Sequence, residues 1–103
     1  MKAIAIKEAL PSTDEDCFVE IEVETPVPSK QELLVRISAV SVNPVDTKVR
    51  RAFDGANGHR ILGWDAVGEV ISVGDEVAEF KPGDRVYYAG DITKPGSNSE
   101  YQI

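Results

Sequence analysis

The chain has 103 residues, of which 42% are hydrophobic and 28% are charged, and its formal net charge is −7 at pH 7. This length suffices for one domain with a modest core, and the composition is that of an ordinary soluble globular protein. The acidic balance excludes nucleic acid and anionic membrane surfaces as partners, because both require basic patches.

Alternating apolar and polar residues predict two strands in the first quarter of the chain. Residues 2–8 alternate as a short strand does, and residues 11–16 form a polar turn that should be exposed. Residues 17–24 give the clearest pattern, because their apolar positions alternate with three glutamates that are expected to face water. Cys17 is expected on the inner face of this strand, where a thiol behaves as a small apolar group.

The middle of the chain is predicted to form a strand, a short helix and a loop. Residues 31–42 alternate and are rich in β-branched side chains, which favours a strand. Asn43 and Pro44 suit the N-cap and the first position of a helix, so a helix is predicted over Pro44–Ala52. Residues 53–60 contain two glycines and are predicted to form a loop.

Three glycines punctuate the apolar stretch of residues 61–74: Gly63, Gly68 and Gly74. Glycine costs backbone entropy in a strand and packs nothing, so tight bends or close backbone approaches are expected here. Gly63 and Gly68 are expected to flank a strand. Asp65 lies between them in apolar surroundings, so its carboxylate should be either hydrogen-bonded or functional.

The last quarter of the chain is predicted to add short strands separated by turns. The Pro-Gly pair at residues 82–83 leads into a strand over Arg85–Ala89, a turn follows at residues 91–96, and another strand begins at residues 97–103. Many short strands, frequent Gly and Pro, and one small helix indicate a mainly β, barrel-like domain.

The central stretch and the segment after it carry a connected set of motifs, namely residues 63–70, Val73, Gly74, Val77, Phe80 and residues 81–86. These motifs resemble the N-terminal, GroES-like domain of the medium-chain dehydrogenase/reductase superfamily, and most of all its quinone oxidoreductase and zinc-type alcohol dehydrogenase-like members. The resemblance spans residues 1–103 and implies one GroES-like, partly open β-barrel domain with one or two short helices. It also implies that the nucleotide-binding domain lies outside this chain, which has no Gly-x-Gly-x-x-Gly pattern, so the chain is expected to be a fragment.

The resemblance places the catalytic cleft where residues 43–46 face residues 63–65. In zinc-dependent alcohol dehydrogenases these places supply a cysteine and a histidine ligand, where this chain has Asn43 and Trp64. Zinc prefers thiolate, imidazole or carboxylate, so no metal is expected at the cleft. The hydroxyl that relays a proton in those enzymes is replaced by Val45.

Without zinc, the expected chemistry is hydride transfer to a quinone or another conjugated carbonyl, whose oxygen needs hydrogen-bond donors. Asn43 is the candidate catalytic residue and the candidate cofactor contact, because its amide both donates and accepts; capping the helix is an equally good reading. Asp46 is the second catalytic candidate, either as an orienting group or as a first-turn carboxylate favoured by the helix dipole. Trp64 and Asp65 are assigned to the substrate cleft, although Trp64 fits the core equally well.

The remaining reactive side chains are expected to be structural or solvated. Lys48, Arg50 and Arg51 form a basic cluster on the helix that could meet a cofactor phosphate, but a solvated face is favoured. His59, the single histidine, has no second ligand near it in the sequence, so metal binding is not expected. Cys17 is the single cysteine and permits no internal disulfide.

The resemblance implies NADPH or NADH as the cofactor, bound mainly by the absent domain, so the chain alone is expected to be inactive. We expect a cytoplasmic protein acting on a small-molecule substrate, with a homodimer of the full-length form, and no apolar run approaches the roughly 18 residues of a membrane span. The alternative is a free-standing GroES-like binding module. The short, mostly polar loop of residues 53–60 disfavours it, because a co-chaperonin requires a mobile apolar loop.

Overall fold

The computed structural model describes all 103 residues. In chain order its elements are β1 (Lys2–Ile6), β2 (Val19–Glu22), β3 (Leu33–Ser41), α1 (Pro44–Ala52), a 3₁₀ turn (Ala56–Gly58), β4 (Arg60–Ile61), β5 (Asp65–Val73), β6 (Arg85–Ala89) and β7 (Tyr101–Gln102). No helix is long and apolar enough to cross a bilayer.

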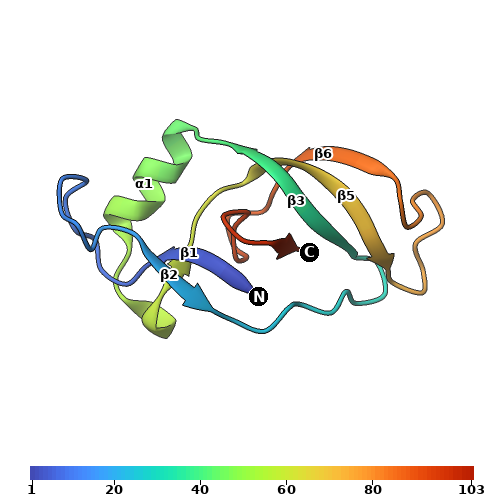
Figure 1. Cartoon of the computed structure of the whole chain (residues 1–103), viewed down its shortest axis with the longest axis horizontal. Coiled ribbons are helices and arrows are strands. Elements are labelled where there is room, and N and C mark those ends of the chain that lie inside the picture. The colour runs from blue at the N-terminus through green and yellow to red at the C-terminus, as the bar shows by residue number, and fades with distance from the viewer.

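The strands form two antiparallel sheets that do not close on each other. One sheet has the order β2-β1-β4 and the other the order β6-β5-β3-β7. Strands β3, β5 and β6 curve together at one end of the molecule, and α1 lies at the other end beside β1 (Figure 1). The predicted mainly β, partly open barrel with a short helix is therefore confirmed.

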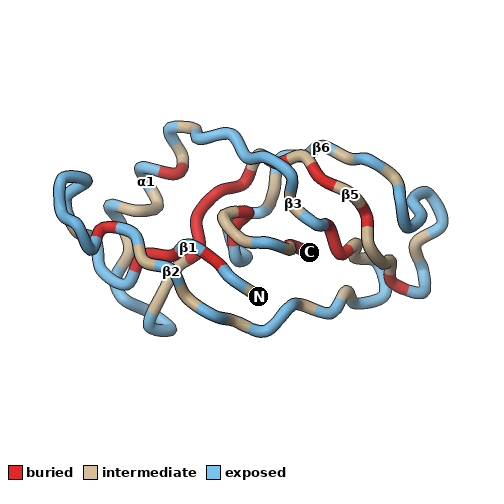
Figure 2. Tube along the Cα trace, in the orientation of Figure 1, coloured by how far each residue is buried: buried red, intermediate tan, exposed pale blue.

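The core is thin, since only 18 of 103 residues are buried. The longest buried run is residues 61–64, which links the end of β4 to the start of β5 and so connects the two sheets (Figure 2). It contributes to two clusters: Ile61 packs with the alanines of β1, and Leu62 and Trp64 pack with Ile6. Because the core is small, each of these side chains carries a large share of the stabilisation by apolar burial.

Helix α1 forms where the sequence predicts it and docks through one apolar stripe. Val45, Val49 and Phe53 recur every four residues and pack against the cluster of Ile6, Leu62 and Trp64. Arg50 and Arg51 lie in its last turn, where positive charge complements the helix dipole.

Strand β2 shows the predicted alternation but is shorter than residues 17–24. Its half-buried and exposed residues alternate, with Glu20 and Glu22 facing water. Cys17 is buried as expected, yet it lies in the loop before β2, so its predicted place on a strand is wrong. The backbone N–H of Cys17 donates to the carbonyl of Asp14, which closes a turn and stops the strand from extending further toward the N-terminus.

The close backbone approach predicted for the glycines of the central stretch is clearest at Gly68, whose predicted place relative to the strand needs a correction. Gly68 lies in the middle of β5 rather than at its edge, so the prediction that it flanks a strand is wrong. A Cβ on Gly68 would stand 2.6 Å from Val35 Cγ1 and even closer to the Arg36 carbonyl oxygen, spacings that real Cβ atoms do not show. The strand needs glycine here because β3 passes so close, and this confirms the predicted close backbone approach.

Register irregularities shape the larger sheet. The pairing of β3 with β5 shifts between Leu34 and Val35 and again between Ile37 and Ala39. At the first shift β5 carries the extra residue, Ile71, and Leu34 and Val35 on the facing β3 are both buried. The predicted strand of residues 31–42 is thus confirmed within two residues at either end.

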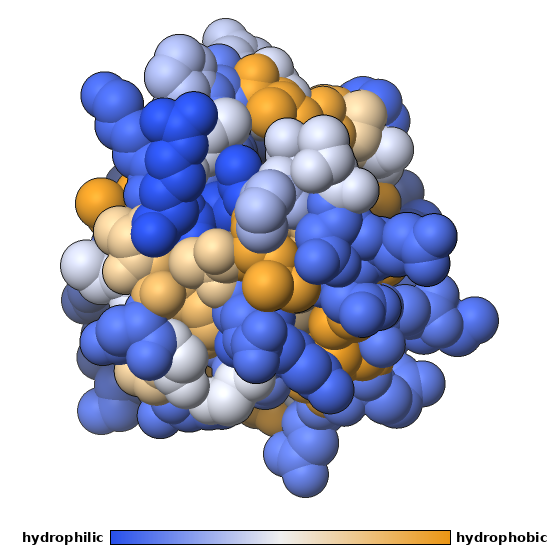
Figure 3. Space-filling view, turned by 90° about the vertical axis from the view of Figure 1, so that its left-hand side faces the viewer, coloured by the Kyte–Doolittle hydropathy of each residue, from blue (hydrophilic) through white to orange (hydrophobic).

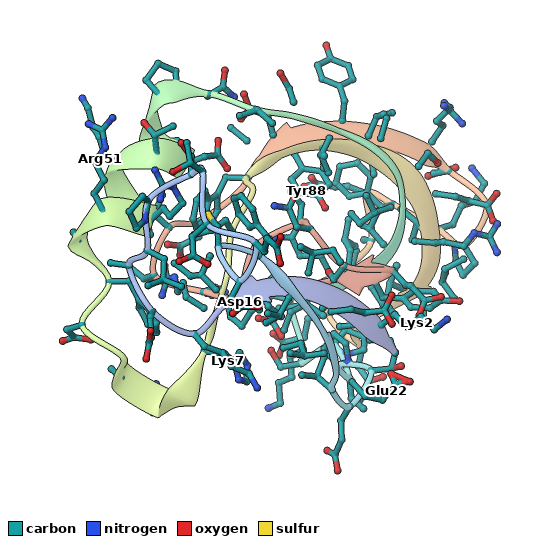
Figure 4. The ribbon with its side chains drawn as sticks, turned by 60° about the vertical axis from the view of Figure 1, so that its left-hand side comes forward. Lys2, Lys7, Asp16, Glu22, Arg51 and Tyr88 are labelled. Atoms are coloured by element: carbon teal, nitrogen blue, oxygen red, sulfur yellow. The ribbon has the colours of Figure 1, made fainter.

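The last strand is much shorter than predicted. Residues 97–99 bond irregularly to two partners: Ser97 N–H donates to Gly63 O at 2.7 Å, and Asn98 O accepts from Ile4 N–H at 2.8 Å. Only Tyr101–Gln102 joins the larger sheet. Gln102 is buried and accepts a 2.6 Å bond from the hydroxyl of Tyr88, which lies on the inner side of the curved sheet (Figure 4).

Candidate functional site

The site predicted from the sequence lies where β3 ends and β5 begins. The pairing of these strands sets Ser41 directly opposite Asp65, the first residue of β5. Side chains two residues apart on an extended chain point to the same side, and Asn43 follows Ser41 by two residues. The register therefore brings Asn43 beside Asp65, although 22 positions separate them in the sequence.

A short hydrogen bond joins these two side chains. Asn43 Nδ2 donates to Asp65 Oδ2 at 2.5 Å, and the same nitrogen lies 3.4 Å from the Ser41 carbonyl oxygen. A bond from an amide to a carboxylate is charge-assisted and stronger than one between neutral groups. The Asp65 carboxylate is thus hydrogen-bonded, which is one of the two roles expected for it.

Asn43 also begins α1. It is the N-cap residue with an extended backbone, and Asp46, the third residue of the helix, bonds back to its backbone as in a capping box. The Asp46 carboxylate is 7% exposed and accepts a 2.8 Å bond from the backbone N–H of Asn43. The predicted N-cap is confirmed, and Asp46 holds the backbone of Asn43 while Asp65 holds its amide.

Trp64 lies in the core rather than on an open surface. It is 3% exposed and packs with Ile6 and Leu62 against α1. Its indole Nε1 donates to the Asp91 carbonyl oxygen at 3.0 Å, and the guanidinium of Arg60 stands 5.7 Å above the ring centroid. These contacts hold Trp64 in place and so fix the position of the next residue, Asp65, where β5 begins.

A shallow, mainly apolar hollow of about 530 Å³ adjoins Asp65. It is lined by the ends of three neighbouring strands, namely residues 39–41, 65–67 and 87–89. Asp65 is the only charged residue among them, and Tyr87 is 88% exposed on the same surface. Sequence reasoning did not single out Ser41 or Tyr87; alternation along the predicted strands was the one signal that could have paired them with Asp65.

The basic cluster of α1 does not gather at this site. Arg50 Nη1 donates to the Leu10 carbonyl oxygen at 2.5 Å and lies 3.9 Å from Cys17 Sγ, so it ties the first loop to the helix. Arg51 points away from the helix into solvent (Figure 4). Hydrophilic residues surround most of this end of the molecule, with apolar areas across its middle and at its top (Figure 3). Both arginines thus have a structural or solvated role here.

The residues at the two positions where the resemblance implies zinc ligands do not fit zinc. No group of three His, Cys, Asp or Glu side chains comes together anywhere in the chain, and His59 lies half-buried in the loop after α1. The nitrogens of Asn43 and Trp64 both donate to oxygens, so neither offers a lone pair. Zinc prefers thiolate and imidazole ligands, and these residues supply neither.

The proteins that are similar to this chain agree on one family. The family model of the alcohol dehydrogenase GroES-like domain matches residues 29–101. A zinc-type alcohol dehydrogenase-like protein of Staphylococcus epidermidis is 45% identical over 103 residues, which cover all of this chain and 30% of that protein.

Two solved structures have the same fold. A Rhizobium etli CFN 42 protein assigned to the zinc-dependent alcohol dehydrogenases superposes with a TM-score of 0.95 at 44% identity, over 99% of this chain and 30% of that one. The quinone oxidoreductase of Coxiella burnetii superposes with a TM-score of 0.84 at 32% identity, over 98% of this chain and 33% of that one. The chain thus spans about a third of the length of these proteins. It belongs to the alcohol dehydrogenase GroES-like domain family of the medium-chain dehydrogenase/reductase superfamily.

Proposed function

We propose that this chain is the substrate-binding and catalytic domain of an NAD(P)H-dependent oxidoreductase that reduces quinones or other conjugated carbonyls without catalytic zinc. The observation that carries the proposal is the 2.5 Å bond from the Asn43 amide to Asp65, which is one of the residues that line an apolar hollow. The family resemblance puts a metal ligand at the position of Asn43, where this chain has a hydrogen-bond donor instead.

The shape and lining of the hollow support a planar, apolar substrate. Its walls are small apolar side chains and tyrosines, with one carboxylate that is already bonded to Asn43. Binding sites for such ligands are mostly apolar with a few placed polar groups. The likeness to the Coxiella burnetii quinone oxidoreductase points to the same substrate class.

The reduced nicotinamide, when bound, supplies the hydride, and we expect the second domain of the full-length protein to hold it, with NADPH the cofactor that the resemblance favours. Hydride addition to a conjugated carbonyl moves an electron pair onto the carbonyl oxygen, which must be stabilised until a proton arrives from solvent. One hydrogen of Asn43 Nδ2 is donated to Asp65 at 2.5 Å, and the other makes a longer bond of 3.4 Å to the Ser41 carbonyl oxygen. We propose that the bound substrate oxygen takes this second hydrogen in place of the Ser41 carbonyl.

The experiment is the Asn43→Ser variant of the full-length protein. Serine caps a helix as well as asparagine does, so the variant should stay folded, and its loss of stability should be limited to that of the bond to the half-buried Asp65. Its shorter side chain cannot reach the substrate, and loss of one such donor typically lowers kcat by on the order of 10²–10³. If kcat survives and only Asn43→Ala lowers the stability, by about 1 kcal/mol, Asn43 is a cap and nothing more.

A further inference from the structure

Asp65 is an unusual residue to find at the edge of the hollow. It is the only charged residue among those lining it, and it begins a strand that is otherwise largely apolar. Its neighbours across the sheet are Ser41 on β3 and Ala89 on β6, both small, so its carboxylate stands on an open face. No cation pairs with it, and Asn43 Nδ2 is its one hydrogen-bond partner in the protein.

A carboxylate in this position decides which way the Asn43 amide points. An ionised carboxylate only accepts hydrogen bonds, whereas an amide has a donor side and an acceptor side. At 2.5 Å from Asp65 Oδ2, Asn43 must present its NH₂ group, because its own oxygen there would meet another acceptor. Asp65 therefore allows only one of the two orientations of the Asn43 amide, whereas a neutral neighbour that both donates and accepts would allow either.

The carboxylate is itself held firmly. Asp65 pairs with Ser41 on one side and with Ala89 on the other, so its backbone lies inside a three-strand ladder. The preceding residue, Trp64, is anchored in the core, and its carbonyl oxygen accepts a 2.6 Å bond from Gly90 N–H. Groups that position a reacting side chain act through such rigid support.

From this geometry we propose that Asp65 is a positioning residue, which orients the Asn43 amide toward the bound substrate. The inference rests on the proposed function of Asn43. It assigns different tasks to the two carboxylates that touch this residue: Asp46 holds the backbone at the start of α1, and Asp65 sets the direction of the side-chain donor.

The test compares Asp65→Asn with Asp75→Asn in the full-length protein. Asp75 is exposed in a loop and makes no hydrogen bond, so Asp75→Asn is the matched control for the loss of one carboxylate. In Asp65→Asn the neighbouring amides can pair in either orientation. We expect kcat to fall about 10- to 100-fold with little change in KM, as for the loss of a supporting partner, while Asp75→Asn behaves as wild type.

An NMR measurement separates this inference from the proposed function. In ¹⁵N-labelled protein, the two Asn43 side-chain hydrogens should differ widely in chemical shift, because one is donated to a carboxylate. This difference should shrink in Asp65→Asn and persist in Asp46→Asn, which removes the charge from the group that accepts the Asn43 backbone N–H but leaves the side-chain bond to Asp65 untouched. An unchanged difference in Asp65→Asn overturns the inference, and so does a reduced difference with unchanged kcat. Loss of kcat in Asn43→Ser is judged independently and tests the proposed function alone.

Discussion

Replacing Gly68 by alanine should destabilise the protein although alanine is the better residue for most backbones. Gly68 lies in β5 with an ordinary negative φ, so alanine meets no backbone strain there. The unfolded chain would lose conformational freedom, which alone would stabilise the fold by about 0.4–1 kcal/mol. The new Cβ, however, would stand 2.6 Å from Val35 Cγ1 and still closer to the Arg36 carbonyl oxygen.

The collision should outweigh the entropic gain. Forcing an extra carbon into a packed site typically costs about 1–3 kcal/mol, and the Arg36 carbonyl belongs to a β3 backbone that cannot move without breaking its ladder with β5. The net loss should be about 1–2 kcal/mol, which for a domain of this size lowers Tm by roughly 5–15 °C.

Thermal unfolding followed by circular dichroism measures this effect, and Gly90→Ala is the control. A Cβ on Gly90 would meet the Trp64 carbonyl oxygen at 3.1 Å, a tight contact but far looser than those at Gly68, so that variant should lose clearly less stability than Gly68→Ala. If Gly68→Ala melts at the same temperature as Gly90→Ala, the close approach of β3 to β5 is not what requires glycine at this position.

Three further outcomes are expected. Ile6→Ala removes three fully buried carbons and should lower the free energy of unfolding, measured with denaturant, by about 2–4 kcal/mol. Ile4 lies on the same strand but is 41% exposed, so Ile4→Ala should lower it by less than about 1 kcal/mol. Equal losses in the two variants would contradict the described core. Burial raises the pKa of Tyr88 to about 12 from an ordinary value of 10.0, so Tyr88 ionises at lower pH in the unfolded state than in the folded state. Tm should therefore fall as the pH rises above about 10, and it should fall less in Tyr88→Phe. An identical fall of Tm in both proteins would refute this role of Tyr88. Elemental analysis after dialysis against a weak chelator should find no stoichiometric zinc in this chain; one zinc per chain that disappears in Asp65→Asn would overturn the metal-free proposal.

The helix and its cap could be predicted because their signals are local. Asn43 followed by Pro44 marks a helix start whatever the rest of the chain does, and the fourfold spacing of Val45, Val49 and Phe53 identifies the face that packs. Strand β6 was predicted with its observed bounds for a similar reason, since the Pro-Gly turn before it fixes where it begins.

The resemblance implies that residues 43–46 face residues 63–65, but the bond between Asn43 and Asp65 could not be predicted, because it depends on strand register. A slip of one residue turns every side chain of a strand to the opposite face, and β3 contains two register shifts against β5 that no sequence pattern announces. The sequence suggested that Asp46 orients Asn43, since only three residues separate them. Asp46 bonds to the Asn43 backbone instead, and the amide bonds to a residue that lies 22 positions further along the chain.

The short extent of β7 has a related cause. Residues 97–103 were predicted to begin a strand, but the backbone groups of residues 97–99 make irregular bonds to two different segments. Such competition between partners is a tertiary effect, which local propensity does not encode.

The bonds between the first and last residues also bear on how the protein is made. Ala3 bridges Ser99, and Glu100 N–H donates to the Lys2 carbonyl oxygen, so β1 finds its last partners only about a hundred residues later. On the ribosome, β1 can pair with β2 early, but the cluster of Ala3, Ala5 and Ile61 stays open on one side until the end of this chain emerges. Contacts of such long range slow folding and leave apolar surface exposed in the meantime. A nascent chain stalled before residue 97 should therefore remain a substrate for chaperones and proteases, however well its first two strands have paired.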